Sequence, residues 1–569
     1  MHSASDVSSI TYTKEVIMRA FAIVLVLSLF LPVLSLGQSE LIVEPYAVSS
    51  KYLNDVIKGD TTASGARVDP ARVYVLRRGG LYFANAFIQN TGYALRVKAE
   101  NKVGPKPVIN AFRGSAGTYA AQIFQVDTLL WLQNLSMNGW DEGGEDFAIY
   151  QSRIINVNRI GSAVYVDSCT LNGSTGTLIQ TSVAARYVQV TNSTFANAGN
   201  VRANNLGNGR AIDFRNVSID SARIENCSFF NMSDRVFRHF GAGQVPMKNL
   251  TVNHNTIFNE LAEHGCIGLG KVDGVIRITN NLFVDNFIFG NDSTATERLG
   301  EFGDTDERGP SGAYRMTFVG TMKDTVTSTS YFIRNNYYSV SPSLQAFYDS
   351  RNGLPDAGVG NLIPLTWYIS GKLGADSVKA FTKVATPIAF TKAPPTAVAM
   401  AEWFFLPIAS GGSGKIKQNA TFKPEYDWQR VTTAYLTDTL NFTYQTSSPA
   451  YTGADGGQPV GDLRWWKLVP LSVEGPDNPA MPSTFALGQN YPNPFNPSTT
   501  IPFDLPQSGN VVLKVFNIIG QEVATLVNGR MEAGRHELVF DASRLTSGVY
   551  IYMLSSGNNS SSKRMVLIK

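Results

Sequence analysis

Apolar and polar positions follow one eight-residue pattern that recurs along the middle of the chain. The pattern is apolar, any, apolar, any, asparagine or a similar polar residue, small polar, any, apolar. Its copies are 130–137, 164–171, 188–195, 222–229, 250–257, 276–283 and 331–338. They start at nearly regular intervals, with one longer interval before 331, and self-similarity at periods of about 20–50 residues marks a repeat architecture. The pattern therefore predicts stacked copies of one structural unit.

Each copy has the two-residue period of β-strands rather than a helical period. Two inward apolar positions alternate with outward ones, a polar pair turns a corner, and another apolar residue begins the next short strand. This is one coil of a parallel β-helix, and a single coil cannot bury its own apolar face. We therefore predict an all-β, right-handed parallel β-helix as the body of the protein.

Stacked coils place equivalent residues above one another at roughly 4.8 Å. Asparagine suits the corner, because it tolerates left-handed backbone conformations and its amide can bond to the copies above and below. The fifth position of the repeat predicts a ladder of Asn134, Ser168, Asn192, Asn226, His254, Asn280 and Asn335. The sixth position predicts a second ladder of Cys169, Ser193, Cys227, Asn255, Asn281 and Asn336.

The positions of the cysteines bear on this predicted alignment of the coils. Cys169 and Cys227 fall on one ladder two coils apart, roughly 9–10 Å, which exceeds the reach of a disulfide, about 7 Å. Cys266 lies off that ladder. We therefore predict three free, buried thiols.

Before the repeat, the chain from Tyr46 to Ile109 has the pattern of strands that lead into the solenoid. Leu53-Asn54 and Ile57, followed by Val73–Leu76, Leu81-Tyr82 and Leu95–Ala99, resemble the first coils of pectate-lyase-like β-helix proteins. The resemblance implies a solenoid over 38–343.

After the repeat, residues 344–470 lose the pattern, and we interpret them as the end of the solenoid and a capping segment. Within them, 448–451 and 461–466 resemble a closing segment that precedes sorting tails. We expect it to cap the open end of the helix, whose strand edges would otherwise invite aggregation. Residues 471–484 then form a linker.

The C-terminal region 485–569 predicts a separate domain. Its proline-rich start cannot form a helix or a central strand. Short alternating runs such as 511–515, 538–540 and 549–553 follow, separated by Gly, Asn and Ser turns. This is the pattern of a small antiparallel, immunoglobulin-like β-sandwich.

Several ordered motifs in this domain resemble the C-terminal sorting domain (type A) of cargo exported by the bacterial type IX secretion system. The residues that carry the resemblance are Asn490, Tyr491, Pro492, Asn493, Pro494, Phe495, Asn496, Pro497, Gly520, Glu522, Gly548 and Tyr550. The resemblance implies recognition by the type IX machinery. The alternative is an ordinary immunoglobulin-like module without a sorting role.

The N-terminal 1–37 predicts a secretory signal peptide. Arg19 precedes an apolar run from Ala20 to Leu36, and small residues follow at a plausible cleavage site. A membrane anchor is the alternative, but the run is short for a span and contains Pro32. With the sorting tail, the signal implies a protein secreted from, or held on the surface of, a Gram-negative bacterium of the Bacteroidetes–Chlorobi kind, with no membrane span in the mature chain.

The composition narrows the range of binding partners that we expect. The formal net charge is +3 and charged residues make up 16% of the chain. This sparse and balanced charge excludes the strong basic field that nucleic-acid binding needs. We therefore expect no nucleic-acid partner.

The resemblance to pectate-lyase-like proteins implies a polysaccharide substrate or ligand. A lyase of this kind needs a cation such as calcium at a uronate carboxylate and a base, often Arg or Lys, for the neighbouring C–H. We identify Arg238 and Lys271 as candidate bases, and Asp234 with Glu263 as a candidate metal-binding pair. The alternative is that Arg235 and Glu263 form only a surface ion pair. A glycoside hydrolase would instead need a pair of carboxylates.

Other polar clusters are weaker candidates. Glu301, Asp304, Asp306 and Glu307 lie in a long insertion, and Asp141, Glu142, Glu145 and Asp146 lie beside Trp140. Each cluster is consistent with a solvent-exposed loop without a ligand, or with a site that binds calcium or a sugar. His239 and His264 lack metal-ligand spacing, and His254 occupies a corner position. The sequence leaves open a secreted polysaccharide lyase or hydrolase, and a non-catalytic surface adhesin or glycan-binding spacer.

Overall fold

The computed structural model describes most of the 569-residue chain. The described residues are 39–139, 152–199, 206–215, 217–239, 246–261, 264–292, 294, 317–321, 329–416, 440–468, 485–490, 493–505, 509–531, 534–557 and 559–569. The expected signal peptide and linker lie outside them.

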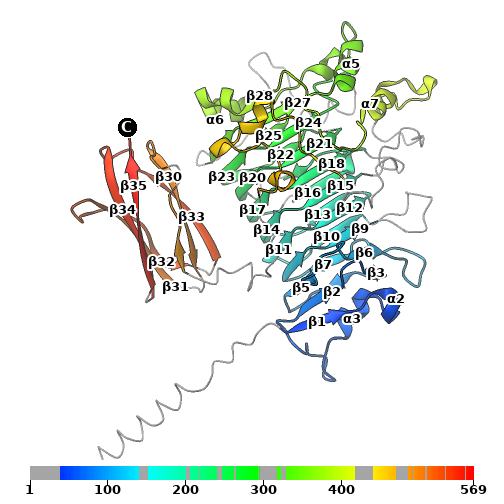
Figure 1. Cartoon of the computed structure of the whole chain (residues 1–569), viewed down its shortest axis with the longest axis horizontal. Helices are drawn as coiled ribbons and strands as arrows, with labels where there is room; N and C mark the ends of the chain where they lie inside the picture. The colour runs from blue at the N-terminus through cyan, green and yellow to red at the C-terminus, as the bar shows by residue number, and fades with distance from the viewer. Residues whose placement is uncertain are drawn as a thin grey trace, which may run out of the picture.

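Three parallel sheets form the body, and the chain visits them in turn (Figure 1). We call them S1, S2 and S3 in the order in which one coil passes through them. S1 contains β1 (Glu40–Val43), β2 (Val73–Leu76), β5 (Leu95–Ala99), β8 (Leu129–Gln133), β11 (Ser162–Asp167), β14 (Ala185–Thr191), β17 (Ile219–Glu225), β20 (Met247–Asn253), β23 (Val272–Thr279) and β26 (Ser330–Arg334).

S2 contains β3 (Leu81–Ala84), β6 (Val108–Ala111), β9 (Ser136–Asn138), β12 (Thr170–Ser174), β15 (Thr194–Ala198), β18 (Ser228–Met232), β21 (Thr256–Glu260), β24 (Leu282–Asn286), β27 (Asn336–Ser339) and β28 (Phe381–Lys383). S3 contains β4 (Ile88–Gln89), β7 (Phe124–Val126), β10 (Arg153–Val157), β13 (Thr177–Thr181), β16 (Arg210–Asp213), β19 (Phe237–Arg238), β22 (Ile267–Leu269) and β25 (Val319–Thr321). The predicted parallel β-helix is confirmed.

The corner between S1 and S2 adopts the predicted backbone conformation. All seven residues of the fifth-position ladder have positive φ, from 51° at Asn192 to 61° at Asn280. Amide stacking occurs at the sixth position, where Asn281 Nδ2 donates to Asn336 Oδ1 at 2.9 Å and Asn255 Nδ2 donates to Asn281 Oδ1 at 2.9 Å. At the fifth position, Asn192 and Asn280 instead donate to Asp167 and Asn253 at strand ends of the preceding coil, and Asn335 donates to Asp455.

A second asparagine ladder, which the repeat did not predict, runs along the corner where S2 ends. Each side chain donates its amide N–H to the amide oxygen of the rung before it, at 2.8–3.2 Å. The rungs are Asn110, Asn138, Asn172, Asn197, Asn231 and Asn259, and all are at most 1% exposed. Stacked amides satisfy buried polar groups that would otherwise be costly.

The interior is one continuous apolar core, and the three thiols lie in buried positions. Cys169, Cys227 and Cys266 are free and buried, so that prediction is confirmed. Burial raises the pKa of Cys169 to about 12. These thiols are therefore inert in the folded chain.

The two ends of the solenoid are covered by helices. The lead-in, expected as strands alone, also contains α2 (Tyr46–Ser49) and α3 (Leu53–Gly59), because Leu53 and Ile57 at helical spacing cover the first coil. At the other end Leu365, Ile369 and Ala380 join the same core. The helical elements there are α5 (Pro342–Ser350), η2 (Ala357–Gly360), α6 (Trp367–Leu373), η3 (Gly374–Lys379), α7 (Val398–Phe405) and η4 (Ile408–Ser410).

The closing segment does not cap the end as expected but lies along the side of the solenoid. Its elements are η7 (Pro449–Thr452), η8 (Asp455–Gly457) and η9 (Leu463–Trp466). Phe442 contacts the outward-facing Phe230 and Phe258 of S2, with ring centroids 5.7 Å and 6.2 Å apart. Arg464 Nη1 donates to the Asn192 carbonyl at 2.7 Å. The aromatic residues of this segment cover apolar side chains that point outward from S2. This packing explains why the segment lies along the side of the solenoid.

The C-terminal domain is the predicted β-sandwich, shown in orange and red in Figure 1. One antiparallel sheet contains β29 (Ala486–Leu487), β30 (Ser498–Leu505) and β33 (Gly534–Asp541). The other contains β32 (Glu522–Met531), β31 (Gly509–Asn517), β34 (Gly548–Ser556) and β35 (Asn559–Leu567). No helix among the described residues is both long and apolar enough to cross a bilayer.

Candidate functional site

The connections between strands point to one face of the solenoid. From β8 onward, connections from S1 to S2 have one or two residues, as in Ser168-Cys169 between β11 and β12, whereas the first two are longer, at 77–80 and 100–107. Connections from S2 to S3 vary widely in length: the shortest is 175–176 and the longest is 287–318. Connections from S3 to S1 also vary, from lengths such as 127–128 to lengths such as 239–246. Loops of variable length on a rigid scaffold commonly carry function. S3 is bordered by such loops on both sides and is the candidate functional face.

The outward positions of S3 form a column of polar residues. Strand pairing places these residues on adjacent coils in the order Gln89, Gln125, Asn156, Gln180, Asp213 and Arg238. Their neighbours in the strands, such as Ile155 and Ile179, point into the core. Successive residues of a strand point to opposite faces, so the column faces outward.

A charged network occupies the β16 and β19 end of this column. Arg210 Nε donates to Asp234 Oδ2 at 2.8 Å, and Arg235 Nε lies 3.4 Å from the same oxygen. His264 Nδ1 lies 2.5 Å from Asp234 Oδ1. Asp234 is 0% exposed. Three coils therefore meet at one buried carboxylate.

Asp213 is the second acidic centre. Its Oδ2 lies 3.5 Å from Arg210 Nη1, 3.4 Å from Arg238 Nη1 and 3.8 Å from Arg215 Nε. Arg210 therefore joins the two aspartates into a single network.

The electrostatics follow from this geometry. Burial raises the pKa of Asp234, but the charges of His264, Arg235 and Arg210 outweigh burial and hold that pKa well below the usual range. Burial, and then the nearby charge of Arg210, lower the pKa of Arg238 to about 10. Asp234 is therefore ionised at neutral pH, and Arg238 loses its proton more readily than an ordinary arginine.

Arg153 adds a cation that no acid pairs with among the described residues. Its Nη1 donates to Gln122 Oε1 at 3.2 Å, and its Nε has no hydrogen-bond partner. Burial, and then Arg215, lower its pKa. Among the described residues, arginines thus outnumber aspartates around the S3 strands, with Arg153, Arg210, Arg215, Arg235 and Arg238 against Asp213 and Asp234.

The structure brings together two of the four predicted catalytic and metal-binding residues. Asp234 and Arg238 belong to the same ion-pair network. Lys271 lies at the corner between β22 and β23, and its side chain makes no hydrogen bond or ion pair in the described part of the chain. Glu263 lies outside the described residues.

Asp234 does not fit the proposed metal-binding role, because both of its oxygens already face Arg210, Arg235 or His264. No group of three or more His, Cys, Asp or Glu residues in the described ranges is arranged to hold a metal ion. The acidic clusters at 301–307 and 141–146 lie outside those ranges. We therefore derive no step through calcium.

The remaining histidines have structural partners. His239 is 2% exposed and its Nε2 lies 3.1 Å from the Val217 carbonyl oxygen, and burial lowers its pKa to about 4. His254 occupies the left-handed corner, and its Nδ1 lies 3.2 Å from the Gly461 carbonyl oxygen. Both are uncharged at neutral pH, since burial lowers the pKa of each.

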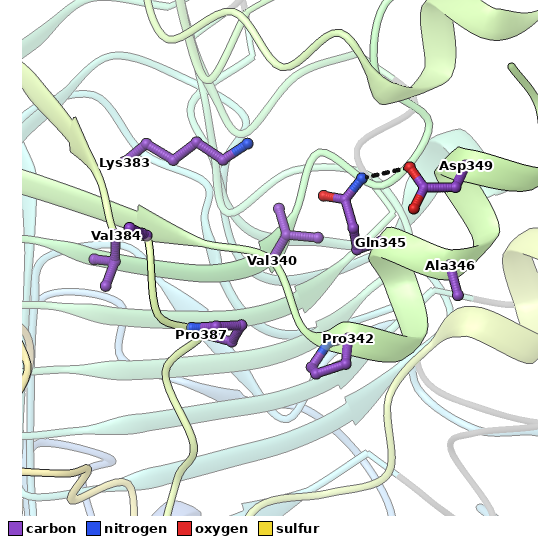
Figure 2. Close-up of a pocket in the computed structure, with 9 residues that line it drawn as sticks. Val340, Pro342, Gln345, Ala346, Asp349, Lys383, Val384 and Pro387 are labelled. Carbon is purple, nitrogen blue, oxygen red and sulfur yellow. Dashed lines mark hydrogen bonds between the residues drawn. The ribbon is translucent and has the colours of Figure 1, made fainter.

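A separate hollow lies between α5 and the segment after β28 (Figure 2). Its cavity volume is about 380 Å³, and Val340, Pro342, Val384 and Pro387 form apolar walls. Gln345 Nε2 donates to Asp349 Oδ1 at 2.9 Å on one side, and Lys383 lies on the other. None of its lining residues belongs to S3.

The sorting motif supports the fold of its own domain. Asn490 is 2% exposed and its Nδ2 donates to Thr499 Oγ1 at 3.0 Å, and Phe495 is 2% exposed in the sandwich core. Tyr550 donates its hydroxyl to the Thr546 carbonyl at 2.8 Å, and Gly520 has a φ of 81° in a turn. Glu522 pairs with Lys514 at the surface. Tyr491 and Pro492 lie outside the described residues.

The fold therefore defines a parallel β-helix protein with a C-terminal β-sandwich. Residues 489–569 match the family model described as a secretion system C-terminal sorting domain. The chain is thus cargo of the type IX secretion system, which delivers it to the extracellular space or the cell surface of a Bacteroidetes bacterium. Searches of the curated proteins and of the solved structures found no match.

Proposed function

We propose that the outer face of S3 binds an acidic extracellular polysaccharide. One observation supports this proposal: among the described residues, arginines outnumber aspartates on this face, and Arg153 is half-buried without an acidic partner there. Guanidinium groups bind carboxylates through paired, charge-assisted hydrogen bonds. In the polar column Gln125 is partly exposed and adds an amide that suits a sugar hydroxyl, whereas Asn156 and Gln180 are buried and bonded to Ser182.

We propose β-elimination as the reaction, with Arg238 as the base. Its lowered pKa makes the neutral form more accessible, as a general base requires. The base takes the proton on the carbon next to the uronate carboxylate. The electron pair of that C–H bond forms a C=C bond, the glycosidic C–O bond breaks, and the leaving oxygen takes a proton from water. Nearby guanidinium groups stabilise the carboxylate as negative charge develops on it.

The second candidate is binding without catalysis. Arg238 Nη1 lies 3.4 Å from Asp213, and the two aspartates of the network face arginines rather than open space. An ion-paired arginine favours its protonated form. This arrangement favours a glycan-binding solenoid. It also gives less support to a hydrolase, which needs a free carboxylic acid and a second carboxylate.

An activity assay of the full chain separates the candidates. The purified protein is incubated with polygalacturonate, pectins and alginate, with calcium or with a chelator, while ultraviolet absorbance of unsaturated ends and reducing sugar are both followed. A lyase gives absorbance that Arg238→Gln abolishes and that Lys271→Gln leaves unchanged. Reducing sugar without absorbance indicates a hydrolase. Binding of the same polymers without either product supports the second candidate, and neither binding nor product contradicts both.

A further inference from the structure

The four-stranded sheet of the C-terminal sandwich exposes a row of apolar side chains on its outer face. Along β34, Tyr550, Tyr552 and Leu554 point into the core. The residues between them point outward, and Val549, Ile551 and Met553 are 36%, 39% and 37% exposed. A contiguous exposed apolar surface marks an interaction site more often than scattered residues do.

Neighbouring strands extend this surface. Phe516 of β31 pairs with Ile551, and Val566 of β35 pairs with Val549. Both neighbours are half-buried and lie beside the outward residues of β34. Polar residues border the row, since the exposed Arg564 pairs with Ile551, and Lys514 and Ser562 pair with Met553 on either side.

The turn after Phe516 presents two more apolar side chains. Ile518 and Ile519 are 72% and 73% exposed. Asn517 fixes this turn, because its Oδ1 accepts hydrogen bonds from the Ile519 and Gln521 N–H groups at 3.2 Å and 2.9 Å. The isoleucines are therefore held in place before any partner binds, which lowers the entropy cost of binding.

Three residues of the sorting motif are turned into their own domain, whereas Gly520 and Glu522 are exposed next to the Ile518-Ile519 turn. Asn490, Phe495 and Tyr550 are 2%, 2% and 6% exposed and bond to or pack against their own domain. A receptor that reads the folded domain must contact what these residues leave exposed.

We infer that the apolar tip and sheet face, formed by Phe516, Ile518, Ile519, Val549, Ile551, Met553 and Val566, is the surface by which this domain docks onto the type IX secretion machinery. The match of 489–569 to a sorting domain supplies the partner. The complementary site is apolar, with a carboxylate placed to meet Arg564. This inference does not depend on the function proposed for S3.

Export of the full chain in a Bacteroidetes host tests this surface. The variants are Ile518→Ser with Ile519→Ser, and Ile551→Thr, which keeps a β-branched side chain in the strand. The matched control is Val539→Thr on β33 of the other sheet, where Val539 is 44% exposed. The protein outside the cell or on its surface is measured against the protein that remains in the periplasm.

We expect both surface variants to lower the exported fraction at least tenfold, with soluble protein accumulating in the periplasm, and Val539→Thr to be exported normally. Unchanged thermal unfolding of the purified variants shows that the domain still folds. Normal export of the surface variants, or an equal loss with Val539→Thr, overturns the inference. So does a concentration-dependent dimer that Ile518→Ser with Ile519→Ser abolishes while export stays normal, because the partner is then a second copy.

Discussion

His264 Nδ1 lies 2.5 Å from Asp234 Oδ1, across two adjacent coils of the solenoid. The other oxygen of Asp234 accepts from Arg210 of the preceding coil. One buried carboxylate thus joins three successive coils on the face where the long connections gather. The network gives S3 a rigid set of guanidinium groups, because their positions are fixed before any ligand arrives.

Substitution of Asp234 by Asn should destabilise the chain strongly. The change leaves Arg210 and Arg235 without the buried charge they face, which costs about 3–5 kcal/mol. Because the pKa of Asp234 is held below its ordinary value, its stabilisation is present above about pH 3.9 and is lost as pH falls below that. Urea unfolding between pH 3 and pH 7 should show this acid-side loss in the wild type and a smaller loss in Asp234→Asn. Equal stability of the two proteins at pH 7 would contradict the role of Asp234.

Glu260 should have the opposite pH dependence. It is 0% exposed, and neither of its oxygens has a hydrogen-bond partner in the described ranges. Burial raises its pKa well above the usual range, more than the neighbouring Cys266 thiol lowers it, and Asp234 adds to the rise. The folded chain therefore binds a proton that the unfolded chain releases above about pH 4.3.

Stability should accordingly fall as pH rises above that value, by about 1.4 kcal/mol per pH unit from this group. Glu260→Gln removes the titration and should be more stable than the wild type at pH 8. Chemical denaturation of both proteins from pH 5 to pH 8 measures the two slopes. Parallel slopes would show that Glu260 does not carry this dependence.

Arg464 should hold the closing segment against the side of the solenoid. Its guanidinium donates to the Asn192 and Ser193 carbonyls at 2.7 Å and 2.9 Å and pairs with Asp462 at 2.5 Å. Arg464→Ala leaves buried acceptors and Asp462 unpaired, at a cost of roughly 3–5 kcal/mol. We expect limited proteolysis to cleave within 440–468 much faster than in the wild type. Lys467→Ala, at an exposed position, is the control, and similar cleavage rates in all three proteins would rule out this role.

The three cysteines should stay unreactive in the folded chain. Burial raises the pKa of each thiol, and none is exposed. A thiol reagent should label no cysteine in native buffer and three after denaturation. Labelling of the native protein at Cys266 would mean that the interior beneath S3 opens to solvent.

The sequence predicts S1 and S2 well but not S3, for a physical reason. The corner at Ser168 or Asn192 needs a left-handed residue and a short, constant connection, so its pattern repeats. Connections around S3 vary in length, so Arg210 and Asp213 fall at no constant offset from the repeat. Their roles depend on which coils become neighbours, and composition alone does not encode this.

The same limit applies to the closing segment and to Lys271. The sequence indicated that 448–451 and 461–466 close the solenoid, but which surface this segment covers depends on Phe230 and Phe258 facing outward from S2. Lys271 follows the β22 strand closely in sequence, yet the turn into β23 places it at a corner rather than among the arginines. The second asparagine ladder could have been found, since Asn172, Asn197 and Asn231 follow the corner residues Ser168, Asn192 and Asn226 by four or five residues.

The most direct test is to replace Arg153 and measure the affinity of the full chain for polygalacturonate. Arg153 is the cation on S3 that has no acidic partner among the described residues. Arg153→Gln removes one charge-assisted contact and should weaken binding about tenfold, with a shallower dependence of the Kd on salt. Arg223→Gln on S1, where Arg223 already pairs with Glu225, is the matched control and should bind as the wild type does. Isothermal titration gives the Kd for each protein. Equal affinity of Arg153→Gln and the wild type, or an equal loss in Arg223→Gln, would contradict the assignment of S3 as the binding face.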